Sequence, residues 1–117
     1  MPLKTFCRTL SFERTAVGFT AEVELRADHP VYEGHFPGQP VVPGVCTVRV
    51  VRELTARAVG YDVWFDTIRE AKFVSALLPS EGLCITVEAT LVGETLRAVV
   101  RHDEQVVLKL QATWKRE

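Results

Sequence analysis

The chain is poor in cysteine and has no long apolar run. Its three cysteines, Cys7, Cys46 and Cys84, are too few and too widely separated for a disulfide framework or a zinc site of the CxxC type. No segment reaches the ~18 consecutive apolar residues that span a bilayer, and the N-terminus lacks the apolar stretch of a signal peptide. We therefore expect reduced thiols, no metal site and a soluble, cytoplasmic protein.

An excess of charge of one sign is also missing. The 14 basic and 15 acidic residues give a formal net charge of −1, which gives no reason to expect nucleic acid or an anionic membrane as a partner. With 117 residues, of which 47% are hydrophobic, the chain predicts one globular domain over residues 1–117. Such a domain is small for an enzyme that encloses a long substrate, which favours a site completed by a second subunit.

The hydrophobic pattern predicts an α+β fold in the order of two strands, one helix and a run of antiparallel strands. The helix is expected over residues 45–59, opened by Pro43 and ended by Gly60. Its apolar arc consists of Val48, Val50, Val51, Leu54 and Ala58. The strands are expected at residues 3–12, 20–26, 61–73, 82–92, 96–102 and 105–114.

Proline and glycine are concentrated in one stretch, residues 29–45, which carries four of the six prolines and three of the seven glycines. Each proline fixes its own φ and pushes its predecessor towards extended backbone. The stretch therefore predicts a stiff, irregular loop, which presents His35 between a glycine and the Phe-Pro-Gly turn at 36–38. An imidazole held beside the first turn of a helix, where backbone N–H donors are unpaired, is suited to acid–base chemistry.

The run from His35 to Val45 reads His-Phe-Pro-Gly-Gln-Pro-Val-Val-Pro-Gly-Val. It resembles the active-site segment of the hot-dog-fold 3-hydroxyacyl-acyl carrier protein dehydratases, with the pattern His-Phe-Pro-Gly-x-Pro-x-x-Pro-Gly-Val. Weaker similarity continues through residues 71–73 and 77–79. The resemblance implies an antiparallel sheet wrapped around one central helix and removal of water from a β-hydroxyacyl thioester, giving a trans-2-enoyl thioester. It also implies an acyl carrier protein as partner and no metal or redox cofactor.

The resemblance also implies roles for individual residues. His35 would take a proton from the carbon next to the thioester carbonyl, and the backbone N–H of Gly44 would stabilise the negative charge left on the thioester oxygen. Substrate-binding residues would be Phe36, Pro43, Val45 and Arg49. Apolar residues of the central helix and of residues 61–73 would line an acyl tunnel between subunits.

One position departs from the family pattern. The family has an acidic residue fourteen positions after the histidine, where this chain has Arg49. A guanidinium stays protonated at neutral pH, so a missing acid would have to be His35 itself, water, Glu53 or Glu33. Arg49 fits three roles: an exposed i,i+4 partner of Glu53, a group that binds substrate or carrier, or a mark of lost catalysis. Variant dehydratases from aryl polyene and related pigment pathways resemble the chain in this departure.

Two other functions stay open from the sequence. A hot-dog thioesterase hydrolyses the same class of substrate with a carboxylate or a positioned water, although the His-Phe-Pro-Gly loop argues against it. A non-catalytic acyl-binding or partner subunit would keep the scaffold without the acid. We expect a homodimer or a higher homo-oligomer, with a heterodimer as the alternative.

Overall fold

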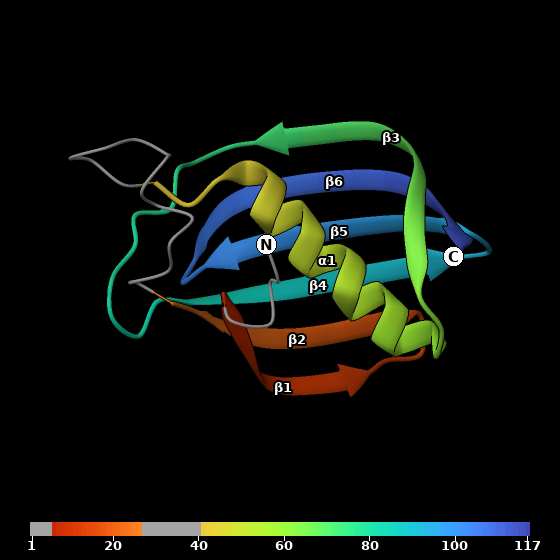
Figure 1. Ribbon diagram of the computed structural model, residues 1–117, viewed down its shortest axis with the longest axis horizontal. Coiled ribbons are helices and arrows are strands. Elements are labelled where there is room, and N and C mark those ends of the chain that lie inside the picture. The colour runs from red at the N-terminus through yellow and green to blue at the C-terminus, as the bar shows by residue number, and fades with distance from the viewer. Residues whose placement is uncertain (1–5, 27–40) are drawn as a thin grey trace.

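The structure is a computed structural model and describes residues 6–26 and 41–117 (Figure 1). The elements are β1 (Cys7–Arg14), β2 (Gly18–Leu25), α1 (Gly44–Val59), β3 (Val63–Phe73), β4 (Cys84–Val92), β5 (Thr95–His102) and β6 (Gln105–Arg116). The predicted α+β order is confirmed. The first strand, expected at 3–12, extends to Arg14, and residues 3–5 of that prediction lie outside the described residues. His35 and Phe36 lie outside the described residues.

The strands form one antiparallel sheet in the order β1-β2-β4-β5-β6-β3. Helix α1 crosses one face of this sheet, as Figure 1 shows. An antiparallel sheet curved around a single helix is the hot-dog arrangement that the sequence predicts. Because the one helix in residues 6–26 and 41–117 covers one face only, the described part of the chain leaves the sheet with a covered face and an open face.

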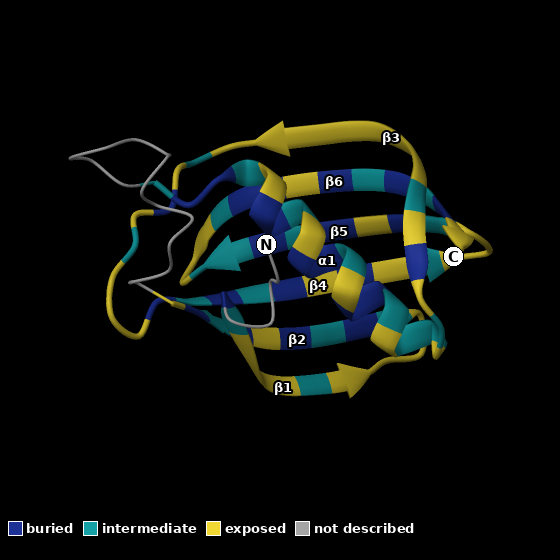
Figure 2. Cartoon of the chain, in the orientation of Figure 1, coloured by how far each residue is buried: buried dark blue, intermediate teal, exposed yellow. Residues whose placement is uncertain are grey.

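Alternation along the strands separates these two faces. On β2 the buried residues are Phe19, Ala21, Val23 and Leu25, and the residues between them face away from the helix. The same alternation runs through β4, β5 and β6, so the core is a layer between the sheet and α1 (Figure 2). Burial of each such apolar side chain contributes roughly 1.5–3 kcal/mol, which holds the helix against the sheet.

Helix α1 begins directly after Pro43, whose φ of −62° and ψ of 135° are extended. It ends at Gly60, where a φ of 87° allows the Gly60 N–H to donate to the Ala56 carbonyl at 2.9 Å. Its buried residues are Cys46, Thr47, Val50, Val51, Leu54 and Thr55. The buried face therefore contains two threonines, whereas Val48 and Ala58 of the predicted arc are only half-buried.

Strand β3 lies at one edge of the sheet and pairs with β6. Its ladder has two irregularities, between Phe65 and Thr67 and between Ile68 and Glu70. Trp64, Ile68 and Phe73 on this strand are exposed. This strand thus presents apolar side chains near the N-terminal half of α1, and no other described strand pairs with its outer edge.

Candidate functional site

A cavity of about 680 Å³ opens where α1 begins. Its walls come from the residues before the helix, from the first helical turn, from the segment after β3 and from β6. The lining residues are Val41, Val42, Pro43, Gly44, Val45, Thr47, Phe73, Val74, Ser75, Ala76, Leu77 and Val107. The described walls carry no charged side chain, so the cavity suits an apolar chain with few polar groups.

Backbone hydrogen bonds hold the two walls together. The Val42 N–H donates to the Leu77 carbonyl at 2.9 Å, and the Val74 N–H donates to the Val107 carbonyl at 2.8 Å. These bonds fix the segment before the helix against the segment after β3. The first turn of α1 is thereby held at the cavity wall by backbone hydrogen bonds as well as by side-chain packing.

Gly44 meets an aromatic ring in this cavity. A Cβ at Gly44 would lie 2.6 Å from Cε1 and 2.8 Å from Cζ of Phe73, too close for any carbon contact. The Phe73 side chain is itself 52% exposed. Glycine is therefore favoured at position 44 because the ring lies against the backbone, which is a steric reason that the sequence did not reveal.

The first turn of α1 offers backbone donors to the cavity. The N–H groups of Cys46 and Thr47 approach the Pro43 carbonyl at 3.0 and 3.4 Å, whereas no group among the described residues accepts from the Gly44 N–H. The first turn also contains no acidic residue. The partial positive charge of the helix start is therefore not neutralised by a neighbouring carboxylate, and an anionic oxygen is favoured there.

Two polar side chains line the cavity, Thr47 and Ser75. The Ser75 hydroxyl donates to the Val106 carbonyl at 2.7 Å, so its hydrogen bond lies within the cavity wall. Thr47 is 3% exposed, and its hydroxyl has no hydrogen-bond partner among the described residues. The sequence pattern gave neither of these described polar side chains a role.

The structure brings together some of the predicted site residues. Pro43, Gly44 and Val45 all line the cavity, although Val45 is 74% exposed. Arg49 is not among the described lining residues. Its Nε lies 3.9 Å from Oε1 of Glu53, with both side chains nearly half-exposed. An exposed i,i+4 pair of this kind contributes a few tenths of a kcal/mol.

Cys46 is buried next to the cavity opening. Burial raises the pKa of the Cys46 thiol, and the positive charge of Arg49 opposes that shift. A thiol with a raised pKa is a poor nucleophile at neutral pH.

In residues 6–26 and 41–117 no three His, Cys, Asp or Glu side chains come together as a metal site. No helix in the same ranges is long and apolar enough to cross a membrane.

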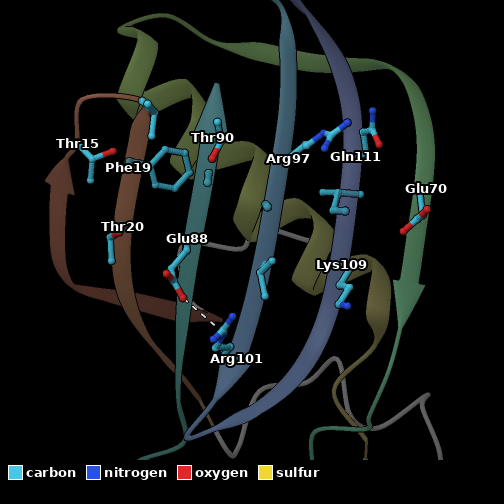
Figure 3. A pocket seen from close by; sticks show the side chains of 15 residues that line it. Thr15, Phe19, Thr20, Glu70, Glu88, Thr90, Arg97, Arg101, Lys109 and Gln111 are labelled. Atoms are coloured by element: carbon cyan, nitrogen blue, oxygen red, sulfur yellow. Dashed lines mark ion pairs between the residues drawn. The ribbon is translucent and has the colours of Figure 1, made fainter. Parts of the chain in front are cut away.

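A second hollow, of about 580 Å³, lies on the open face of the sheet. Figure 3 shows its charged side chains rising from β4, β5, β6 and β3, with α1 behind the sheet. They are Glu70, Glu88, Arg97, Arg101 and Lys109. Nε of Arg101 lies 3.5 Å from Oε1 of Glu88, and this pair is about half-exposed.

The family model of the ApeI dehydratase matches residues 12–113 of the chain. The chain is 37% identical to the 3-hydroxyacyl-acyl-carrier-protein dehydratase FabZ of Pelotomaculum thermopropionicum, over 69% of this chain and 62% of that relative. It is 25% identical to FabZ of Chlamydia pneumoniae, over 92% and 78% of the two chains. The match therefore spans less than two thirds of the first of these relatives.

Solved structures share the fold. The chain superposes on a chain of the dehydratase heterocomplex ApeI:P from Xenorhabdus doucetiae with a TM-score of 0.75 and 23% identity, over 93% of this chain and 97% of that one. The E. coli PaaI protein from a phenylacetic acid degradation operon gives a TM-score of 0.66 and 12% identity, over 98% and 83%. At these identities the likeness concerns the hot-dog fold alone.

Proposed function

Because the chain belongs to the ApeI-like dehydratase family, we propose that it removes water from a β-hydroxyacyl thioester to give a trans-2-enoyl thioester. The substrate is carried by an acyl carrier protein in fatty acid or polyene biosynthesis. The observation that carries the proposal is the cavity at the start of α1, which combines apolar walls with an available backbone N–H at Gly44. Apolar walls suit an acyl chain, and the N–H suits its thioester oxygen.

The elimination needs two events. A base takes a proton from the carbon next to the thioester carbonyl, and the bond between the β-carbon and its hydroxyl then breaks. In our proposal His35 is the base, because an imidazole exchanges protons near neutral pH. The Gly44 N–H donates to the thioester oxygen, where negative charge develops. Loss of one such donor costs about 3 kcal/mol in well-studied acyl-transfer enzymes.

The departing hydroxide needs a proton, and Arg49 does not supply it. A guanidinium keeps its proton at any relevant pH, and this one lies outside the described cavity lining. The proton taken up by His35 is the simplest source, since its return to the leaving hydroxyl balances the reaction without another acid. We retain Arg49 as a proposed contact of the substrate's carrier, together with Phe36, Pro43 and Val45 as substrate-binding residues.

We propose that the protein acts as a homodimer joined through β3. Strand β3 is an edge strand with exposed Trp64, Ile68 and Phe73, and such an edge is a template for pairing with another strand. Pairing through β3 would bring a second subunit beside the cavity, because Phe73 contributes to its wall. A heterodimer is the alternative, and the solved ApeI:P structure is itself called a heterocomplex.

The test is hydration of a carrier-bound trans-2-enoyl thioester, followed by loss of its ultraviolet absorbance. We expect turnover in the unmodified protein, no turnover in His35→Ala, and unchanged turnover in the control His102→Ala. His102 is the last residue of β5 and is not among the described residues that line the cavity. Release of free thiol instead of hydration would identify a thioesterase.

The presence of Arg49 where the family has an acidic residue favours one alternative function, that of a non-catalytic acyl-binding or partner subunit. In that case the unmodified protein binds acyl thioesters without turnover, and Arg49→Glu, which restores the family's acidic residue, gains hydration. Activity of the unmodified protein that Arg49→Glu does not raise would exclude this rival.

A further inference from the structure

We infer that the hydroxyl of Thr47 binds the β-hydroxyl group of the substrate and holds it in place for elimination. The inference rests on the proposed function, because it names the part of a β-hydroxyacyl thioester that Thr47 contacts. It concerns a residue to which the sequence pattern gave no role. Three observations support it, and each comes from the described residues.

The first observation is a contrast between two threonines on α1. Thr55 is fully buried, and its hydroxyl donates to the Val51 carbonyl at 2.8 Å, which is the usual arrangement for a threonine inside a helix. Thr47 is 3% exposed but has no hydrogen bond of this kind. A buried hydroxyl without a partner costs free energy, so its retention is explained if a ligand supplies the partner.

The second observation is that this hydroxyl is not sealed in the core. Among the described residues, the fully buried side-chain polar atoms without a hydrogen bond are Nε of Arg101, which has only the ion pair with Glu88, and Nε1 of Trp114. The Thr47 oxygen is not one of them, and Thr47 lines the cavity. The other polar lining side chain, Ser75, is already bonded to Val106. Of the described lining residues, Thr47 therefore has the polar side chain that is left for a ligand.

The third observation is the spacing between Thr47 and Gly44. Residues three apart share a helix face, and a rise of 1.5 Å per residue separates them by about 4.5 Å along the axis. In a β-hydroxyacyl thioester the hydroxyl-bearing carbon is the second carbon from the thioester carbonyl. A substrate whose thioester oxygen accepts from the Gly44 N–H therefore brings its β-hydroxyl within reach of a group one helical turn further on.

A threonine hydroxyl both donates and accepts a hydrogen bond but does not ionise near neutral pH. Thr47 therefore binds and orients the leaving hydroxyl and transfers no proton. In this role Thr47 distinguishes a β-hydroxyacyl ligand from the analogue that lacks the β-hydroxyl oxygen. A site built to bond a hydroxyl discriminates against the analogue that lacks it, because its own polar group is then left unpaired.

The test compares two ligands that differ only in that oxygen. They are the β-hydroxyacyl and the saturated acyl amides of pantetheine, with the same chain length and with an amide in place of the thioester so that elimination does not proceed. Calorimetry on the full chain gives the affinity ratio. We expect Thr47→Val to lower the affinity for the β-hydroxyacyl ligand by about 3- to 10-fold, as for loss of one neutral hydrogen bond. Affinity for the saturated ligand should not change.

Two control variants accompany this measurement. Thr47→Ser keeps the hydroxyl and should keep the preference for the β-hydroxyacyl ligand. Thr55→Val makes the same change two turns further along α1, removes an internal hydrogen bond, and should leave the preference intact even if it lowers the melting temperature. An unchanged ratio in Thr47→Val would overturn the role of Thr47 alone. Failure of the unmodified protein to bind either ligand would overturn the proposed function and the role of Thr47 with it.

Discussion

The two hollows of this molecule differ in chemistry more than in size. The cavity at the start of α1 measures about 680 Å³ and has apolar described walls, and the hollow on the open face measures about 580 Å³ and carries five charged side chains. Ionic groups on the open face are exposed to water, which weakens their interactions. One unpaired hydroxyl or N–H group in an apolar wall has a larger effect on ligand binding, because water does not compete for it.

Beside each hollow lies a glycine at which a Cβ would clash with a neighbouring group. Replacing these two glycines by alanine should have the largest effects on the free energy of unfolding. A Cβ at Gly18 would collide with the backbone carbonyl of Ala89 on β4, which no rotation can move away. We expect Gly18→Ala to lower the free energy of unfolding by about 3 kcal/mol. A Cβ at Gly44 would meet only the partly exposed ring of Phe73, so Gly44→Ala should cost less, about 1–2 kcal/mol.

Urea unfolding of both variants checks these values, and a second substitution separates the two causes. Phe73→Leu removes the ring, so it should recover most of the stability lost in Gly44→Ala and none of that lost in Gly18→Ala. Phe73→Leu alone is the reference for this comparison. An equal loss in the double and the single Gly44 variant would show that the ring is not the reason for the glycine.

The charged hollow should matter little for stability and not at all for acyl binding. The Glu88–Arg101 pair is half-exposed, and exposed pairs contribute between nothing and about 1 kcal/mol. We expect Glu88→Gln to lower the free energy of unfolding by about 0.5 kcal/mol and to leave the affinity for the saturated acyl amide unchanged. A large loss of acyl affinity would place ligand binding on the open face and reverse our assignment of the two hollows.

A smaller expected effect concerns the reactivity of two cysteine thiols, one on the covered face of the sheet and one on the open face. Cys7 pairs with Leu25, whose side chain is buried on the covered face, and Cys84 pairs with Glu24 on the open face. Burial, assisted by the negative charge of Glu53, raises the pKa of Cys7 to about 11 from an ordinary value of 9.0. Burial raises the pKa of Cys84 as well, with smaller contributions from nearby glutamates.

At pH 8 the thiolate fraction of Cys7 should be roughly a hundredfold below that of an ordinary thiol. Iodoacetamide should therefore modify Cys84 before Cys7, which mass spectrometry of the peptides would reveal. The folded state favours the protonated Cys7 thiol, so its contribution to stability is present below pH 9 and is lost as the pH rises from about 9 to about 11. Faster modification of Cys7 would contradict its burial.

Most of the fold could be predicted from the sequence, because periodicity and turn residues act locally. Gly60 ends the helix where predicted, and the gaps between the strands predicted at 61–73, 82–92, 96–102 and 105–114 overlap the breaks between the observed strands. Each of these breaks contains a residue with positive φ, namely Gly82, Gly93 and Asp103. At Gly93 and Asp103 the break is a short hairpin turn, which requires that conformation. The buried arc of α1 was placed less well, because Thr47 and Thr55 were counted as polar although both are buried.

The site was predicted only in part. Pro43, Gly44 and Val45 were found because a contiguous motif carries them, and the structure places all three on one cavity wall. Phe73 was predicted only as one of the apolar residues of 61–73, because its contact with Gly44 joins residues far apart in the chain. Thr47 was given no role, because its importance lies in a missing hydrogen bond. The spacing of Thr47 from Gly44 was the one available signal. The roles of His35 and Phe36 stay predictions.

Strands β4, β5 and β6 form a meander joined by two short turns, so each of its ladders links neighbours in the sequence. Ladders of this kind close quickly, because little chain entropy is lost before they form. By contrast, the ladder between β3 and β6 joins Val63 to Arg116, and one hydrogen bond of the cavity wall joins Val74 to Val107 on β6. During synthesis the chain would therefore hold the start of α1 without its wall until the last strand has emerged, and the cavity would be among the final parts to assemble.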